Sequence, residues 1–268
     1  MLDVISYVDE RKACLKRHVG HFIERGDRAP RLAIVTDNRN FGANQSYIKS
    51  KTQFAMGVGI DCDVIVLNDD QEFITNADYY DGIIVQYPFR DLTFGEFQTY
   101  VTKHVPPTQD VDGLGKHSVF SACTPLGIVN YIDHLRDTEV IPEHITVNVI
   151  GAGGLVGKPL VEMLMYDPHT TVCVTRSRTN PDVACAFREW ADVIVCATPE
   201  HDIIKWVDYD KVYIDCGCNL VDGKLLGNVS RECYTHDAPV TPVPGGVGRM
   251  TVLSLFENTI GAYLMRGK

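Results

Sequence analysis

Short apolar runs alternate with helix-forming segments along almost the whole chain, and this alternation constrains the fold most strongly. A first series of strand-like runs covers residues 31–36, 62–67 and 82–86, with a helix predicted at about 43–57. A second series covers residues 146–150, 171–175, 192–196 and 211–215. Runs that are apolar throughout are typical of buried parallel strands with helices on both faces of the sheet. The pattern predicts an α/β protein.

The chain length and one proline- and glycine-containing region predict two domains. A chain of 268 residues can hold one large domain or two of moderate size. Residues 105–125 separate the two strand series and favour a domain crossover. We expect an N-terminal α/β catalytic domain of residues 1–119 that the last helix rejoins within residues 249–268. Residues 120–248 should form a Rossmann-type domain, with the ligand cleft between the two.

Composition and charge exclude several classes of protein. The net charge of −10 argues against a nucleic-acid-binding protein, which normally carries a basic face. No apolar run reaches membrane-spanning length, and the first residues lack the features of a signal peptide. The nine cysteines include no Cys-x-x-Cys pair and the nine histidines are scattered, so neither a metal site nor a disulfide framework is expected. A cytoplasmic protein is predicted.

A glycine-rich turn follows the predicted strand 146–150 and opens a helix. Its spacing is Gly-x-Gly-x-x-x-Gly, one residue longer than the usual dinucleotide fingerprint, and alone it is a weak signal because such glycines often serve packing. Its strand–turn–helix context favours dinucleotide binding, in which helix N-terminal amides approach a pyrophosphate. The predicted cofactor-binding residues of this turn are Gly151, Ala152, Gly153, Gly154, Val156 and Gly157.

The end of the next strand bears on the choice of nucleotide. NAD sites usually have an acidic residue here, whereas this chain has Arg176, Ser177 and Arg178. Guanidinium groups suit a 2′-phosphate, although these arginines could simply be solvated. NADP is therefore favoured and NAD remains possible.

Residues 241–251, Thr-Pro-Val-Pro-Gly-Gly-Val-Gly-Arg-Met-Thr, combine two prolines with three glycines before a helical pattern that runs from Met250 to Leu264. Prolines restrict the backbone and glycines permit unusual conformations, so the run is typical of a rigid backbone that approaches a ligand closely. A surface loop that caps the last helix is the alternative.

The motifs together resemble the methylenetetrahydrofolate dehydrogenase/cyclohydrolase family over nearly the whole chain. Each motif is weak alone, and the set in this order is specific. The motifs are Tyr47 to Lys51 (Tyr-x-x-x-Lys), Val85 to Pro88 (Val-Gln-Tyr-Pro), Gln109 to Gly113 (Gln-Asp-Val-Asp-Gly), Cys123 to Gly127 (Cys-Thr-Pro-x-Gly), Gly151 to Pro159, Ser177 to Thr179, Ile214 to Asn219 and the Pro-Gly run.

The resemblance implies two reactions and a set of catalytic residues. The reactions are oxidation of 5,10-methylenetetrahydrofolate with NAD(P) and hydrolysis of the methenyl product to 10-formyltetrahydrofolate. Lys51 resembles the cyclohydrolase lysine, Gln86 is implied to tune it, and Asp112 is implied to hold the pterin. Tyr47 lies four residues before Lys51, so both side chains can share one helix face. Without the resemblance, Lys51 would be interpreted as a solvated lysine, Gln86 as a strand-end amide and Asp112 as a turn aspartate.

The resemblance also implies further contacts and a homodimer. Folate is implied to contact Pro244, Gly245 and Gly246 in addition to Tyr47, Lys51, Gln86 and Asp112, and the nucleotide to contact Cys196, Ala197, Thr198 and Cys218. A homodimer through the Rossmann-type domains is implied.

The chain departs from the family pattern at several positions. Ala152 stands where an arginine that contacts the 2′-phosphate is usual, and Arg176 replaces a histidine. Asn44 replaces a serine, Gln109 a lysine and Arg249 a proline. Two alternatives stay open: a Rossmann dehydrogenase of an amino or hydroxy acid, which would share the glycine-rich turn, and a non-catalytic nucleotide-binding relative, which only the departures at Ala152 and Arg249 support.

Overall fold

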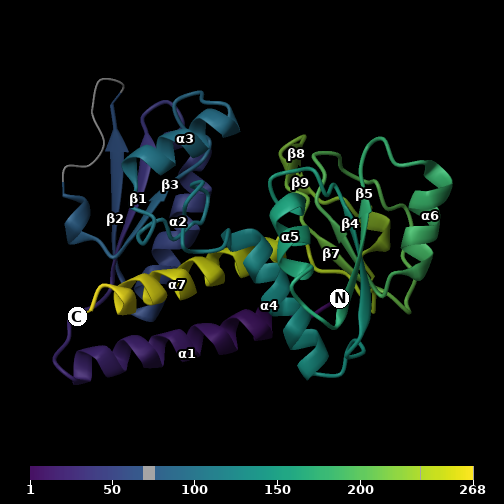
Figure 1. Ribbon diagram of the computed structural model, residues 1–268, viewed down its shortest axis with the longest axis horizontal. Coiled ribbons are helices and arrows are strands. Elements are labelled where there is room, and N and C mark those ends of the chain that lie inside the picture. The colour runs from purple at the N-terminus through teal and green to yellow at the C-terminus, as the bar shows by residue number, and fades with distance from the viewer. Residues whose placement is uncertain (69–75, 236, 268) are drawn as a thin grey trace. The chain divides into compact units, whose positions relative to one another are not determined.

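The structure is a computed structural model that describes residues 1–68, 76–235 and 237–267 (Figure 1). The chain divides into two compact units. A four-stranded unit contains Met1–Val8 and Thr124–Thr251, and a three-stranded unit contains Asp9–Cys123 and Val252–Lys268. The divisions near the two ends of the chain therefore fall inside helices α1 (Val4–Glu24) and α7 (Val247–Met265).

The three-stranded unit contains a parallel sheet of order β2-β1-β3. Its strands are β1 (Arg31–Asp37), β2 (Asp61–Leu67) and β3 (Gly82–Val85), with Arg31 opposite Asp61 and Leu32 opposite Gly82. The 3-10 helix η1 (Ala77–Tyr79) precedes β3. The apolar residues of β1 and β3 pack against α3 (Phe94–His104), which supplies Phe97 and Val101 to the core.

Local sequence signals set the ends of the helices in this unit. Helix α2 (Phe41–Val58) ends at Gly59, whose φ of 85° is left-handed and lets its N–H donate to the Ala55 carbonyl at 2.9 Å. Helix α3 begins with a capping box in which Thr93 and Glu96 bond each other's backbone N–H groups. These caps set the C-terminal end of α2, which carries Tyr47 and Lys51, and the N-terminal end of α3.

The four-stranded unit contains a parallel sheet of order β5-β4-β6-β7. Its strands are β4 (Ile145–Ile150), β5 (Thr170–Thr175), β6 (Val193–Cys196) and β7 (Val212–Asp215). The connecting helices are α4 (Cys123–Asp137), α5 (Gly157–Leu164) and α6 (Pro181–Trp190); an antiparallel hairpin β8 (Asn219–Val221)–β9 (Lys224–Leu226) and η2 (Arg231–Cys233) complete the unit. Figure 1 shows α5 and α6 beside the strands that precede them.

The predicted α/β class with parallel sheets is confirmed, and each predicted strand begins and ends within one residue of the observed one. The expectation of complete burial is wrong for β2, since Val64 and Val66 are exposed. The physical reason is position: β2 forms an edge of its sheet, whereas β1 lies at the centre and the other edge strand, β3, pairs with Asp110 through Ile83. Within the described residues, no helix combines the length and the apolar character that crossing a membrane requires.

Candidate functional site

A buried lysine–glutamine pair lies in the three-stranded unit. Lys51 on α2 is 7% exposed, and its Nζ donates to Oε1 of Gln86 at 2.8 Å. Gln86 follows the last residue of β3, and its Nε2 donates to the Tyr87 carbonyl at 2.9 Å, which fixes the orientation of the amide. The partner of the amine is therefore a neutral acceptor held in place by the backbone, and both residues were predicted site residues.

The position of α2 is fixed by Asn44, one of the departures from the family pattern. Its Nδ2 donates to Thr36 Oγ1 at 3.2 Å and to the Pro88 carbonyl at 3.0 Å. These bonds join α2 to the ends of β1 and β3, the strand that leads into Gln86. Asn44 is 1% exposed, so a loss of these bonds would leave a buried amide without acceptors.

The buried carboxylate of Asp37 closes the same end of β1. It accepts hydrogen bonds from the backbone N–H groups of Arg39, Asn40 and Arg90 and from the Asn40 side chain. Burial acts to raise the pKa of Asp37, but these hydrogen bonds outweigh it and hold the pKa below its ordinary value. The ionised Asp37 thus organises the turn that precedes α2.

Asp112 lies in the loop that leads to Cys123, the first residue of α4. The Asp112 carbonyl accepts from the Cys123 backbone N–H at 3.2 Å, and the Cys123 thiol donates to the Val111 carbonyl at 3.2 Å. Burial, and then the charge of Asp112, raises the pKa of Cys123 well above its ordinary value, while Lys51 acts in the opposite direction. The thiol therefore remains protonated and serves as a donor to the Val111 carbonyl, and the charges of Asp112 and Lys51 act on it in opposite directions.

Tyr47 lies one turn before Lys51 on α2, and 51% of its surface is exposed. The tyrosine and the lysine share a helix, as predicted, but differ in burial. Tyr47 is thus available at the surface while Lys51 is enclosed.

The glycine-rich turn of the four-stranded unit has the tight geometry that its sequence predicts. Gly151 has a φ of +90°, and a Cβ there would lie 2.3 Å from the Ala197 carbonyl oxygen. A Cβ at Gly157 would lie 2.3 Å from the Gly151 carbonyl oxygen. Gly153 and Gly154 are exposed, so the turn presents bare backbone just before α5 begins. This geometry suits a pyrophosphate at the helix N-terminus.

The segments beside this turn are also ordered by polar contacts. Ala197 donates from its backbone N–H to the Ile150 carbonyl at 2.8 Å, and Asn228 Nδ2 donates to the Thr198 carbonyl and hydroxyl, both at 3.0 Å. The strand β6 therefore places Cys196 as its last, buried residue, directly before the Ala197–Thr198 pair.

Cys218 follows a segment that Asp215 holds in place. The buried Asp215 carboxylate accepts from the N–H groups of Gly217, Asn228 and Val229 and from the Tyr234 hydroxyl. Burial, together with the Asp215 charge, raises the pKa of Tyr234. The predicted residue Cys218 is exposed just beyond this cluster.

The arginines expected at a 2′-phosphate lie directly after β5. Arg176, Ser177 and Arg178 are exposed, and the Arg176 N–H donates to Thr179 Oγ1 at 2.9 Å. Ala152 donates from its backbone N–H to the Thr175 carbonyl at 3.4 Å and is 2% exposed. The Arg176 turn and the Ala152 turn are therefore neighbours.

The Pro-Gly run of the four-stranded unit is also constrained. The Val243–Pro244 bond is cis, Gly245 has a φ of +108°, and a Cβ at Gly246 would lie 2.5 Å from the Pro242 carbonyl oxygen. Predicted folate contacts thus fall in both units, with Pro244 to Gly246 in the four-stranded unit and the Lys51 group in the three-stranded unit.

Several organising residues were not predicted from the sequence as part of the site. They are Asp37, Cys123, Asp215 and Asn228. Each acts through partners that are distant in the chain or through backbone groups. The available signals were the position of Asp37 and Asp215 at the ends of apolar strands and the family motifs that contain Cys123 and Asp215.

Comparisons with known proteins identify relatives over the whole chain. The family described as "Tetrahydrofolate dehydrogenase/cyclohydrolase, NAD(P)-binding domain" matches residues 122–266. The bifunctional protein FolD of Halothermothrix orenii is 34% identical over 290 aligned residues, which cover 100% of this chain and 99% of that protein.

Solved structures agree with these matches. The bifunctional FolD methylenetetrahydrofolate dehydrogenase/cyclohydrolase of Campylobacter jejuni is similar with a TM-score of 0.81 and 27% identity, covering 98% of each chain. A 5,10-methylenetetrahydrofolate dehydrogenase of the silkworm Bombyx mori has a TM-score of 0.81 and 28% identity, covering 97% of this chain and 96% of that one. The chain belongs to the tetrahydrofolate dehydrogenase/cyclohydrolase family.

Proposed function

We propose that this protein oxidises 5,10-methylenetetrahydrofolate with NAD(P) and hydrolyses the methenyl product to 10-formyltetrahydrofolate. The observation that carries the proposal is the enclosed Lys51–Gln86 pair, in which Nζ donates to Oε1 at 2.8 Å. Family membership supports both reactions.

The oxidation requires alignment more than it requires a strong base. The bridging carbon gives up a hydride, and its two flanking nitrogens stabilise the cation that forms. NAD(P), when bound, accepts that hydride. The turn from Gly151 to Gly157 fits such a group, because its exposed glycines carry no side chain that would block a close approach and α5 begins at the turn. The role of Asp112 in this step is to hold the pterin N–H groups and so orient the bridging carbon.

The hydrolysis requires proton transfer from an attacking water. Acting as the base, Lys51 Nζ takes a proton from the water that adds to the methenyl carbon. The adduct then opens by cleavage of the bond between that carbon and N5, N5 takes up the proton, and the formyl group stays on N10. Gln86 Oε1 holds Nζ in position, and the amide cannot itself take up the proton. Tyr47, exposed on the same helix, contacts the folate.

We further propose a preference for NADP over NAD. Arg176 and Arg178 lie exposed at the end of β5, next to the turn that contains Ala152. The small, buried Ala152 side chain cannot reach a phosphate, so the guanidinium groups from the other side of the turn would supply the contacts.

A cytoplasmic homodimer is the proposed state of the protein. The edge strand β5 leaves most of its side chains only partly covered, and Val183 and Trp190 of α6 are exposed. Pairing of two copies would cover these groups. No disulfide joins the described cysteines, which fits a reducing compartment.

The two activities are separated by substitution of Lys51. In Lys51→Met the amine is lost while the side-chain volume is nearly kept, so cyclohydrolase activity should fall at least about 100-fold and dehydrogenase activity should remain measurable. Lys49→Met is the matched control, because Lys49 is exposed on the same helix and should leave both rates unchanged. Retained hydrolysis in Lys51→Met would refute the assigned role.

A further inference from the structure

Gln109, which stands where relatives usually have a lysine, begins the segment that carries Asp112. Its side chain is 3% exposed, and its Nε2 donates to the carbonyl of Ala77 at 2.9 Å and to that of Tyr80 at 2.5 Å. Its own carbonyl accepts from the Ile83 N–H at 2.7 Å. Both donors of a single amide are thus used on two backbone oxygens, and the backbone of the same residue is tied to β3.

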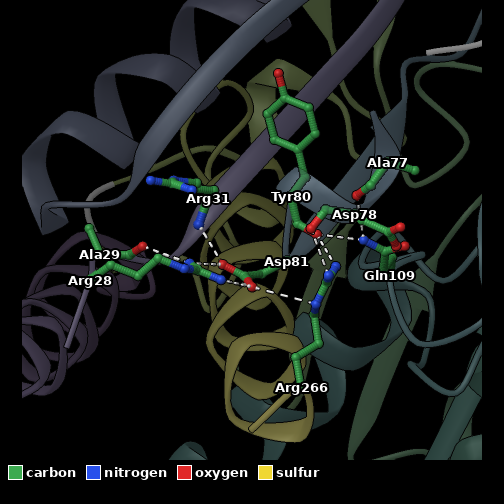
Figure 2. A network of polar contacts seen from close by, with 9 residues as sticks. All are labelled: Arg28, Ala29, Arg31, Ala77, Asp78, Tyr80, Asp81, Gln109 and Arg266. Carbon is green, nitrogen blue, oxygen red and sulfur yellow. Dashed lines mark hydrogen bonds and ion pairs between the residues drawn. The ribbon is translucent and has the colours of Figure 1, made fainter. Parts of the chain in front are cut away.

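The segment that receives these bonds is itself held firmly (Figure 2). The buried Asp81 carboxylate accepts two bonds of 2.7 Å from the Arg28 guanidinium and one of 2.8 Å from the Arg31 N–H. Arg266, just beyond the end of α7, donates to the Tyr80 carbonyl and, at 2.7 Å, to the Asp78 carbonyl. Gln109 and Arg266 therefore converge on one carbonyl oxygen, that of Tyr80, from different parts of the chain.

The backbone between Gln109 and Asp112 is closely packed. Asp110 pairs with Ile83 in an isolated parallel bridge, and Val111 is fully buried where a Cβ on Gly82 would lie 2.9 Å from it. Gly113 follows Asp112 with a φ of +69°, and a Cβ there would lie 2.5 Å from the Ser121 backbone. Only Asp110 and Val111, both packed against the start of β3, separate Gln109 from Asp112, so a displacement of Gln109 should be passed on to Asp112.

We propose that Gln109 is a positioning residue that sets the place of the Asp112 carboxylate for folate binding. This inference rests on the proposed function, in which Asp112 holds the pterin. Gln109 does not touch the substrate; its two amide donors set the entry of the Asp112 loop against the anchored 77–81 segment. Lysine also carries more than one donor on a chain of sufficient length, so the two residue types perform the same task.

Substitution at Gln109 tests the proposal by comparing the KM for methylenetetrahydrofolate with the KM for the nucleotide. Gln109→Met keeps the length of the side chain and removes both donors, so the KM for methylenetetrahydrofolate should rise about tenfold because its oriented contact is displaced. The KM for the nucleotide should stay within about twofold, since that site is formed by the four-stranded unit. Gln109→Lys restores donors and should return the folate KM to within about threefold of the wild-type value.

Arg266→Met is the matched control. It removes a donor from the same Tyr80 carbonyl but lies outside the Asp112 loop, so it should lower the melting temperature without changing the folate KM. Should Gln109→Met fail to fold, Gln109→Asn, whose shorter amide cannot reach both carbonyls, serves in its place with the same expected rise.

The outcomes separate the inference from the proposed function. A wild-type folate KM in the Gln109 variant, or an equal rise in Arg266→Met, would overturn the positioning role while leaving the function intact. Wild-type protein without folate turnover would overturn both.

Discussion

The buried carboxyl group of Asp110 should make the stability of the protein respond to pH in an unusual direction. Burial raises the pKa of Asp110 from 3.8 to about 6, with a smaller contribution from the charge of Asp112, and the Gly115 N–H opposes the rise by donating to Oδ2 at 2.7 Å. A carboxyl group whose pKa is higher in the folded state binds more protons when folded. Its ionisation therefore destabilises the fold above about pH 6, and this cost is relieved as the pH falls towards 4.

The magnitude follows from the shift. Between about pH 8 and about pH 4.5, linkage to a single group with these two pKa values changes the free energy of unfolding by about 2 kcal/mol in favour of the folded state. Asp37 and Asp167 act in the opposite direction, because their pKa values are lowered, but they lose their stabilising effect mainly below their ordinary value of 3.8. The window between about pH 4.5 and 8 thus isolates Asp110 from both groups.

Urea denaturation of wild-type protein and Asp110→Asn across this window measures the effect. Asparagine keeps an acceptor for Gly115 but cannot ionise, so any cost of the substituted amide is nearly constant with pH. When the pH is lowered from about 8 to about 4.5, the unfolding free energy of the wild type should rise by about 2 kcal/mol relative to that of Asp110→Asn. Asp112→Asn should make this pH-dependent change smaller, because it removes the charge of Asp112, which contributes to the raised pKa of Asp110. Parallel pH dependences for wild type and Asp110→Asn would refute the reasoning.

Two further predictions concern the nucleotide site. Gly151→Ala forces a Cβ onto a residue at φ +90° and to 2.3 Å from a backbone oxygen, so nucleotide binding should weaken at least about tenfold, as measured by titration calorimetry. Gly153→Ala, where nothing lies within 4 Å of the added Cβ, is the control for the turn, and equal losses in both variants would contradict the role of the tight geometry. Arg176→Gln, alone or with Arg178→Gln, should raise the KM for NADP about tenfold and leave that for NAD unchanged, because only NADP carries the 2′-phosphate. A matching rise for both nucleotides in steady-state kinetics would speak against this assignment.

The parts of the fold that depend on local pattern could be predicted from the sequence. The central strands β1, β4 and β6 are read from continuous apolar runs, and the positive φ of Gly151 follows from a glycine at a strand-to-helix turn. The β8–β9 hairpin was not predicted, although Asp222 and Gly223, both at positive φ, form a typical two-residue turn signal. The exposure of β2 could not be predicted, because strand order within the sheet depends on contacts between distant segments.

The hydrogen bonds that organise the site could not be predicted from the sequence. Asn44 is visible only as a departure from a family pattern, and its acceptors Thr36 and Pro88 lie on either side of it in the chain. Gln109 likewise depends on carbonyls about 30 residues earlier. Hydrogen bonds to backbone oxygens leave no residue-type signature at the accepting position, so these partners become evident only in three dimensions.

The central claim, that this protein oxidises a folate-bound one-carbon unit with a nicotinamide nucleotide, is tested most directly by initial rates with 5,10-methylenetetrahydrofolate. NADP and NAD are compared side by side at matched concentrations of purified wild-type protein. The account predicts turnover with both the methenyl and the formyl product formed, and a higher kcat/KM with NADP than with NAD. Tight nucleotide binding without turnover of the folate would contradict it and favour a non-catalytic nucleotide-binding protein.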